Sequence, residues 1–287
     1  MLETVIKPKA KDLGDNFVVR RALPAMEKRS VGPFVFWDHM GPVTLTPEKE
    51  LKVRPHPHIG LATITWLFSG EIIHRDSLGN IQPIRPGEVN WMTSGSGIVH
   101  SERSRIAEGE LELEGIQLWL ALPKEYEDID ASFYHAKGDE LPRIKKGAME
   151  LTLVAGEGLG KKSPVPVYSD LFYFNVKNQG EPTFEYQLKD GHEAALYVIK
   201  GSVGIGGQDF ERYDLLLFKA GEKLSLEIGP EAHFMFFGGE SFPEKRHLFW
   251  NFVSSDLEKI EEAKKRWRND EFPKVIDDEI ERIPLPE

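Results

Sequence analysis

The sequence predicts an all-β fold, because three of its features are typical of short strands joined by tight turns. Apolar segments rich in Val, Ile, Phe and Trp recur at close spacing along most of the chain. Glycine and proline turn signals separate these segments, among them Ser69-Gly70 and Pro86-Gly87. Residues 111–122 alternate between apolar and polar side chains, as expected for a strand with one buried face. Together these features indicate a sandwich or barrel.

The strand candidates form two series, which a connector at residues 133–142 separates. The turn signals divide the first series into residues 31–42, 59–68, 71–77, 81–85, 88–92, 98–103 and 111–122. The second series begins with residues 148–155, 165–176 and 183–188. The β pattern thus starts afresh after the connector, which predicts two β units.

The composition describes a globular protein long enough for one large domain or two ordinary ones, with 287 residues, 40% hydrophobic and 29% charged. The net charge of −11 argues against direct binding of nucleic acid. The absence of cysteine excludes disulfides and zinc–thiolate sites. No apolar run is long enough for a membrane span, and residues 1–7 lack the core of a signal peptide. We expect a soluble monomer of the cytoplasm, or also of the nucleus if the source is eukaryotic.

The candidate functional site lies in residues 55–102. Two pairs of potential ligands with two-residue spacing open and close this stretch, namely His56 with His58 and His100 with Glu102. Side chains on a strand repeat with period two, so each pair points to one face. If the two strands face each other, three imidazoles and one carboxylate converge. This mixed nitrogen and oxygen ligand set predicts a metal site.

Prolines flank the first histidine pair. Pro55 and Pro57 fit an edge or rim strand, where a missing backbone donor costs little. The alternative to a metal site is that these prolines stiffen a loop and that Glu102 pairs with Arg103 or Arg105. We favour the metal site, because both pairs occur within one turn-rich β segment.

The ligand types narrow the choice of metal. Three histidines and a carboxylate leave one or two positions open on a six-coordinate ion, which favours Fe(II), Mn(II), Ni(II) or Co(II) over a closed structural zinc site. His74 and Asp76 are candidates for hydrogen bonds that orient the ligands, but a purely structural role is the interpretation that we favour for both. Asp38 and His39, at the end of segment 31–42, belong either to a turn or to the rim of the pocket.

The second half contains a degenerate repeat of the first, since residues 195–203 match residues 64–72 and residues 213–218 match residues 87–92. Carried to the ligand positions, this alignment replaces the four ligands by Gln187, Lys189, Leu226 and Ile228. The repeat keeps the strands and loses the ligands. We therefore expect one metal site, in an N-terminal domain at residues 1–135, and a degenerate C-terminal domain at residues 136–287.

The tail of the chain changes to a helical pattern. Ser255 and Glu258 form a capping box that predicts a helix at about residues 256–268, with Ser255 as the N-cap. Leu257, Ile260 and Trp267 share one face of this helix.

Several motifs resemble those of the pirin family in the cupin superfamily, and they cover nearly the whole chain. They are Val31-Gly32-Pro33-Phe34, Gly41-Pro42, Pro55-His56-Pro57-His58-Ile59-Gly60, His74-Arg75-Asp76-Ser77-Leu78-Gly79, Pro86-Gly87, Ser94-Gly95-Ser96-Gly97-Ile98-Val99-His100-Ser101-Glu102, Trp250-Asn251-Phe252-Val253-Ser254-Ser255 and Phe272-Pro273. The resemblance implies two tandem cupin β-barrels of the double-stranded β-helix (jelly-roll) type with a short C-terminal helix.

The same resemblance implies a ligand set and a metal. His56, His58, His100 and Glu102 would bind one Fe(II) ion per chain, with other divalent transition metals as alternatives. The general cupin pattern has a glutamate soon after the histidine pair, where this chain has Ala62 and Thr63 in that region, and Glu102 stands in its place as it does in pirins.

Two functions follow from the resemblance. Some pirin-like proteins have quercetin 2,3-dioxygenase activity, which opens a flavonol ring with O2 and releases carbon monoxide. Here this implies a flavonol-like or other chelating substrate, with Glu102 as a metal ligand and as the general base for the 3-hydroxyl proton. The alternative is a non-enzymatic, iron-dependent redox switch or co-regulator that binds a transcription factor or a metabolic enzyme. We favour the dioxygenase.

Overall fold

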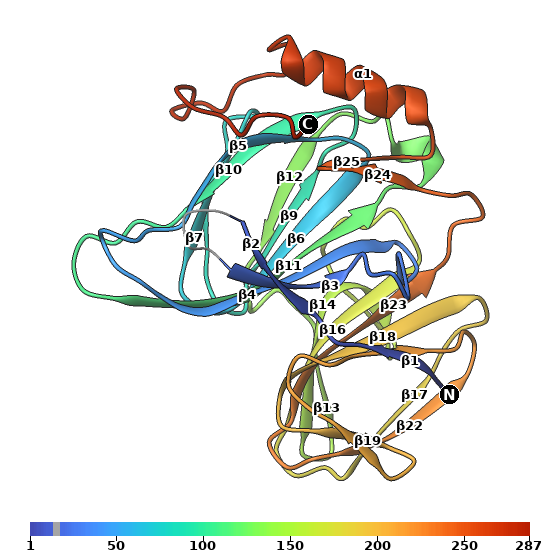
Figure 1. Ribbon diagram of the computed structural model, residues 1–287. Helices are drawn as coiled ribbons and strands as arrows, with labels where there is room; N and C mark the ends of the chain where they lie inside the picture. Colours follow the sequence, from blue (N-terminus) through green and yellow to red (C-terminus); the bar gives the residue numbers. More distant parts are fainter. Residues whose placement is uncertain (14–17) are drawn as a thin grey trace. The chain divides into compact units, whose positions relative to one another are not determined.

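The computed structural model describes residues 1–13 and 18–287, and its elements are strands except for one short 3-10 turn and one C-terminal helix (Figure 1). The chain forms two compact units. The first consists of Met1–Ala10, Arg20–Trp37 and Gly138–Phe242, and the second of Lys11–Val19, Asp38–Lys137 and Pro243–Glu287. In the part of the chain that is described, no helix is long and apolar enough to span a membrane. The all-β prediction is confirmed, and the domain boundary expected at residue 135 stays a prediction.

The first unit contains an eight-stranded sheet and a four-stranded sheet. The larger has the order β1-β21-β18-β23-β16-β14-β13 with β15 paired to β14, and its strands are β1 (Leu2–Ile6), β21 (Leu215–Phe218), β18 (His192–Lys200), β23 (His233–Glu240), β16 (Leu171–Asn178), β14 (Met149–Gly158), β13 (Arg143–Lys146) and β15 (Lys161–Lys162). The smaller has the order β17-β22-β19-β20, and its strands are β17 (Thr183–Gln187), β22 (Lys223–Ile228), β19 (Val203–Ile205) and β20 (Gln208–Phe210). One hydrophobic cluster, which includes Phe174, Phe184, Leu224 and Phe236, packs between them.

The second unit is built on a seven-stranded sheet. This sheet has the order β12-β9-β6-β11-β4-β3-β2, and its strands are β12 (Ser132–Ala136), β9 (Val89–Thr93), β6 (Leu61–Ser69), β11 (Leu111–Ala121), β4 (Phe34–Leu45), β3 (Val18–Leu23) and β2 (Lys9–Asp12). A four-stranded sheet has the order β5-β10-β7-β8, and its strands are β5 (Lys52–His58), β10 (Ile98–Arg103), β7 (Ile72–Asp76) and β8 (Ile81–Ile84). A short pair, β24 (His247–Phe249) and β25 (Phe252–Ser254), completes the unit.

The two four-stranded sheets have the same connectivity, as the repeat in the sequence predicts. The alignment was wrong in detail for the first ligand pair, because Gln187 and Lys189 are both exposed. The side chains of β17 that enter the hydrophobic cluster are Phe184 and Tyr186, three positions before the two residues of the alignment. Aromatic residues thus take the place of histidines in this sheet.

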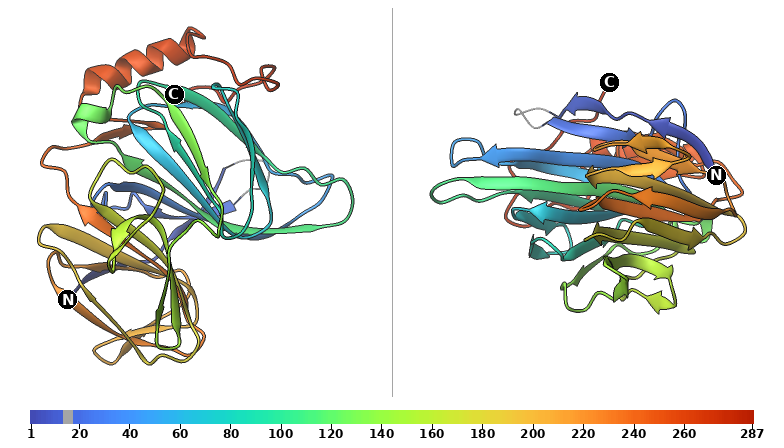
Figure 2. Two further views of the ribbon diagram at one scale, coloured as in Figure 1. Left: turned by 180° about the vertical axis from the view of Figure 1, so that it is seen from behind. Right: turned by 90° about the horizontal axis from the view of Figure 1, so that it is seen from below.

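The C-terminal helix α1 spans Leu257–Arg268 and confirms the predicted position. Its N-cap is Asp256, which accepts a hydrogen bond from the backbone of Glu258, so the prediction of Ser255 was wrong. The reason is the buried carboxylate of Glu127, which accepts hydrogen bonds from the backbone and the hydroxyl of Ser255. Figure 2 shows the 3-10 turn η1 (Lys124–Tyr126), which precedes Glu127, beside the start of α1.

One face of α1 packs against the rest of the second unit. Ile260, Ala263 and Trp267 are buried, whereas Leu257 is exposed and does not share their face as predicted. The predicted end of a strand near Asp38 and His39 was also wrong, because β4 continues to Leu45. Both residues lie in the middle of this strand and are buried.

Candidate metal centre

The two strands that carry the candidate ligands are antiparallel neighbours. His100 on β10 pairs directly with His56 on β5, and Ile98 pairs with His58. β5 is the first strand in the order of its sheet, which confirms the edge position expected from Pro55 and Pro57. The register therefore brings the two histidine-bearing ends together.

Three buried imidazoles converge where these strands pair. The exposed fractions of His56, His58 and His100 are 7%, 1% and 1%. Nε2 of His58 lies 3.0 Å from Nε2 of His100, and one ligand nitrogen from each of the three rings lies within 4.8 Å of the others. Two nitrogen ligands at right angles on one ion, with typical bonds of about 2.1 Å, are about 3.0 Å apart. The spacing of this triad fits a bound metal ion.

Burial keeps the three rings neutral. It lowers the pKa of His56 to about 4, and it lowers the pKa values of His58 and His100 well below their usual range, with repulsion from His56 adding to the effect. His56 donates from Nδ1 to the backbone carbonyl of Arg54 at 2.9 Å, which leaves a lone pair on Nε2. Metal binding requires unprotonated nitrogens. The triad therefore has the donor set of a transition-metal site at neutral pH.

His74 and Asp76 form a hydrogen-bonded chain that ends on Nδ1 of His100. Nε2 of His74 lies 3.0 Å from Oδ2 of Asp76, and Nδ1 of His74 lies 3.3 Å from Nδ1 of His100. Because the carboxylate accepts, Nε2 of His74 carries the proton and its Nδ1 is an acceptor. His100 then donates from Nδ1, and the lone pair on its Nε2 faces His58. This arrangement favours the supporting role of His74 and Asp76 over a purely structural one.

Asp76 is itself fixed by four hydrogen bonds from Leu78 and Asn80. The backbone N–H groups of Leu78 and Asn80 donate to Oδ1 at 2.9 and 3.1 Å, and the side-chain amide of Asn80 donates to both oxygens. Burial acts to raise the pKa of Asp76, but the hydrogen bonds from His74 and Asn80 outweigh it and the pKa is lowered. The ring of Phe133 stacks on His74 with the centroids 4.5 Å apart. The carboxylate therefore stays charged and its orientation is set.

Glu102 is buried on the same strand as His100 but has a different environment. The side-chain amide of Gln117, on β11, donates to both carboxylate oxygens at 2.8 and 2.9 Å, and the hydroxyl of Thr65 lies 3.5 Å from Oε1. Burial raises the pKa of Glu102 above its usual value, although these hydrogen bonds oppose the shift. The triad within 4.8 Å consists of histidines. The role of Glu102 as a fourth ligand stays a prediction.

Gln117 is a residue of the site that sequence reasoning did not identify. It lies in the alternating segment 111–122, where a half-buried polar residue among apolar neighbours is the available signal. A strand pattern alone does not show that its amide reaches a carboxylate on another sheet.

Comparison with known proteins points to one family. The family model described as Pirin matches residues 16–120, and the model described as the Pirin C-terminal cupin domain matches residues 173–273. A protein of Caulobacter vibrioides named pirin-like protein is 45% identical over 292 aligned residues, which cover 100% of both chains. A protein of Pseudomonas aeruginosa, provisionally named as a quercetin 2,3-dioxygenase, is 37% identical over 91% of this chain and 82% of its own.

A solved structure agrees with these matches. The crystal structure of a quercetin 2,3-dioxygenase from Acinetobacter baumannii has a TM-score of 0.92 and 33% identity to this chain. The alignment covers 99% of this chain and 95% of the other. The prediction of two cupin domains with one C-terminal helix is thereby confirmed.

The triad predicts that His56→Ala removes metal binding. Purified wild-type protein loaded with Fe(II) under anaerobic conditions should retain about one ion per chain, and H56A should retain almost none, because the loss of one of three imidazoles leaves too few ligands to hold the ion through desalting. Elemental analysis after desalting measures the ratio. His247→Ala, on β24 and outside the triad, is the matched control, and equal metal content in both variants would contradict the assignment.

The supporting chain predicts an order of effects for Asp76→Asn and His74→Phe. In D76N the backbone N–H groups of Leu78 and Asn80 hold the amide oxygen, so the amide N–H points at Nε2 of His74. His74 then carries its proton on Nδ1 and donates to Nδ1 of His100. The proton of His100 moves to Nε2, where it blocks the lone pair that would bind the metal. H74F removes the acceptor but keeps the ring. We expect D76N to weaken Co(II) binding by about 100-fold and H74F by about 10-fold, measured by titration of visible absorption. If the two variants acted only through lost packing, H74F would weaken Co(II) binding more than D76N.

Proposed function

The chain belongs to the pirin family, and from this premise we propose that it is a dioxygenase of the quercetin 2,3-dioxygenase type with one iron ion held by His56, His58, His100 and Glu102. The observation that carries this proposal is the convergence of three buried, neutral imidazoles beside a buried carboxylate with a raised pKa. The 37%-identical relative and the 33%-identical solved structure bear the name of this activity.

The iron, when bound, supplies Lewis-acid polarisation and positions for the oxygens of a chelating substrate. The histidines hold it without adding charge, so the overall charge of the centre depends on the one carboxylate. His74 and the backbone of Arg54 keep two of the rings oriented. Water is largely kept from the site, because all four proposed ligands are at least nine-tenths buried.

Glu102 is the residue proposed to move a proton. Burial raises the pKa of Glu102 in the metal-free protein, and one of its carboxylate oxygens would accept the proton of the flavonol 3-hydroxyl. Deprotonation prepares the flavonol for ring opening by O2 with release of carbon monoxide. Gln117 donates to both oxygens and keeps the carboxylate in place during the transfer.

The direct test is an oxygen-dependent reaction of the iron-loaded protein. Anaerobic loading with Fe(II), followed by quercetin and then O2, should bleach the flavonol absorbance over many turnovers and release one carbon monoxide per quercetin. H56A treated in the same way should leave the absorbance unchanged. Full iron content without bleaching contradicts the dioxygenase and leaves the redox-dependent co-regulator, which a pull-down with oxidised and reduced protein would detect.

The role of Glu102 predicts that Glu102→Gln slows the reaction by about 100-fold or more, since a positioned general base contributes about 10²–10⁴-fold. The amide keeps the shape but accepts no proton. Turnover is measured by loss of quercetin absorbance at matched iron content, which separates the base from the ligand role. Glu112→Gln, an exposed change on the same strand as Gln117, is the control, and full activity of E102Q at full iron content would exclude the base.

A further inference from the structure

The last residues of the chain, 270–287, form what we call the C-terminal strap, which lies against β5 and β10 (Figure 1). Phe272, Val275 and Leu285 of the strap join a hydrophobic cluster that also contains Val99 of β10. The ring of Phe272 lies so close to the turn before β10 that a Cβ on Gly97 would be 2.7 Å from it. The strap therefore packs directly on the strands of the candidate metal centre.

The polar contacts of the strap fall on residues next to the proposed ligands. Asp278 accepts hydrogen bonds from the hydroxyl of Ser101 at 2.7 Å and from Nε and Nη2 of Arg103 at 2.7 and 2.6 Å. Ser101 stands between His100 and Glu102 in the chain. Since side chains alternate along a strand, Asp278 holds β10 from the face opposite the ligands.

The strap also holds β5, at the point where its pairing with β10 is irregular. His100 pairs with His56 but Glu102 pairs with Val53, so β5 has one extra residue between these two pairs. Such a bulge interrupts the hydrogen-bond ladder. The backbone N–H of Ile283 donates to the carbonyl of Pro55, inside this bulge, at 2.9 Å. The strap thus bridges β5 and β10 where their own hydrogen bonds do not.

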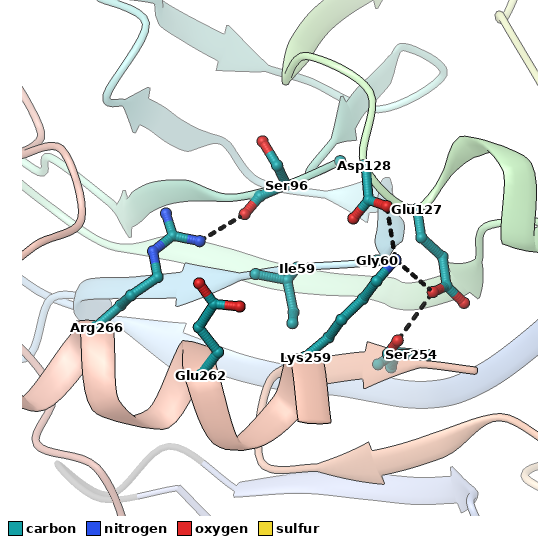
Figure 3. Close-up of a pocket in the computed structure, with 11 residues that line it drawn as sticks. Ile59, Gly60, Ser96, Glu127, Asp128, Ser254, Lys259, Glu262 and Arg266 are labelled. Atoms are coloured by element: carbon teal, nitrogen blue, oxygen red, sulfur yellow. Dashed lines mark hydrogen bonds and ion pairs between the residues drawn. The ribbon is translucent and has the colours of Figure 1, made fainter. Parts of the chain in front are cut away.

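The helix before the strap provides a fixed end. Lys259 of α1 reaches Asp128 at 2.6 Å, and Arg266 donates to the backbone carbonyl of Ser96 at 3.0 Å, on the wall of a pocket of about 190 Å³ (Figure 3). Nε1 of Trp267 donates to the carbonyl of Ile283 at 3.0 Å, so the strap folds back onto the helix. The strap is therefore attached both to α1 and to the two strands of the candidate metal centre.

We propose that Asp278 is a positioning residue of the metal centre: it ties the strap to β10 while Ile283 ties the strap to β5 at the bulge, and this keeps His56 and His100 in register for the metal. Metal binding in turn stabilises the packing of the strap on the two strands. The contact is a forked, charge-assisted one with Arg103, the two side chains being 11% and 20% exposed. Coupling between two binding events is reciprocal, so each stabilises the other by the same factor. The inference rests on the metal site proposed above and adds a residue 178 positions away from His100.

The test compares Asp278→Ala with Asp277→Ala, the same change on the exposed neighbouring carboxylate. Titration with Co(II), followed by visible absorption, should show about 10-fold weaker binding in D278A and unchanged binding in D277A. A factor of about 10 is the lower end of the effect of replacing a residue that orients a metal ligand. Hydrogen exchange of wild-type residues 270–287 should slow by a comparable factor on Co(II) addition, a change that a purely structural role would not produce.

The outcomes separate the two proposals. Equal Co(II) affinity in D278A and D277A, or strap exchange that is independent of Co(II), overturns the coupling while the metal site stands. Wild-type protein that takes up no Co(II) or Fe(II) overturns the metal site and the coupling with it. If D278A does not fold, the exchange measurement on the wild type still decides.

Discussion

Three imidazole rings share a small buried space, and the direction of their lone pairs governs the arrangement of the chain around them. At 3.0 Å, the two Nε2 atoms of His58 and His100 repel each other unless a proton or a cation lies between them. Burial keeps each ring uncharged with a single proton, so contacts outside the triad decide which nitrogen carries that proton. The ring orientations therefore depend on groups outside the triad, which are the carbonyl of Arg54 for His56 and the ring of His74 for His100. A set of oriented, neutral nitrogens of this kind favours a transition-metal cation.

The second four-stranded sheet shows what the same scaffold does without this constraint. β17 and β22 pair in the manner of β5 and β10, but Phe184, Tyr186 and Leu226 fill the corresponding interior. A hydrophobic filling is stable in itself and needs no bound ion. The sheet with histidines also lines a hydrophobic cluster that includes Ile72 and Ile84, but it has a polar cluster as well. The hydrogen-bond chain of this polar cluster ends on Asp76, which accepts four hydrogen bonds from Leu78 and Asn80. The histidine site is thus organised by directed polar contacts, whereas its counterpart is organised by packing.

The sequence was sufficient for features that depend on local spacing. Period two placed His56, His58 and His100 together, and the turn signals and motifs predicted the fold. Features that depend on contacts between distant segments were missed or misassigned. Gln117 reaches Glu102 from another sheet, and the buried Glu127 displaces the helix cap from Ser255 to Asp256. Neither contact leaves a periodic signal, because each involves one residue on a strand or turn far away in the chain.

The edge position of β5 is predicted by local sequence, whereas the contacts that cover this edge come from a distant segment of the chain. Pro55 and Pro57 are tolerated because β5 pairs on one side, yet an edge strand with a bulge is the least constrained place in a sheet for a metal ligand. The chain covers this edge with its own last residues, through Ile283 on β5 and Asp278 on β10. In our proposal the geometry of the site therefore depends on a segment that the ligand motif does not contain. The strap contacts β5 next to His56, where the hydrogen-bond ladder that would otherwise hold the register is interrupted.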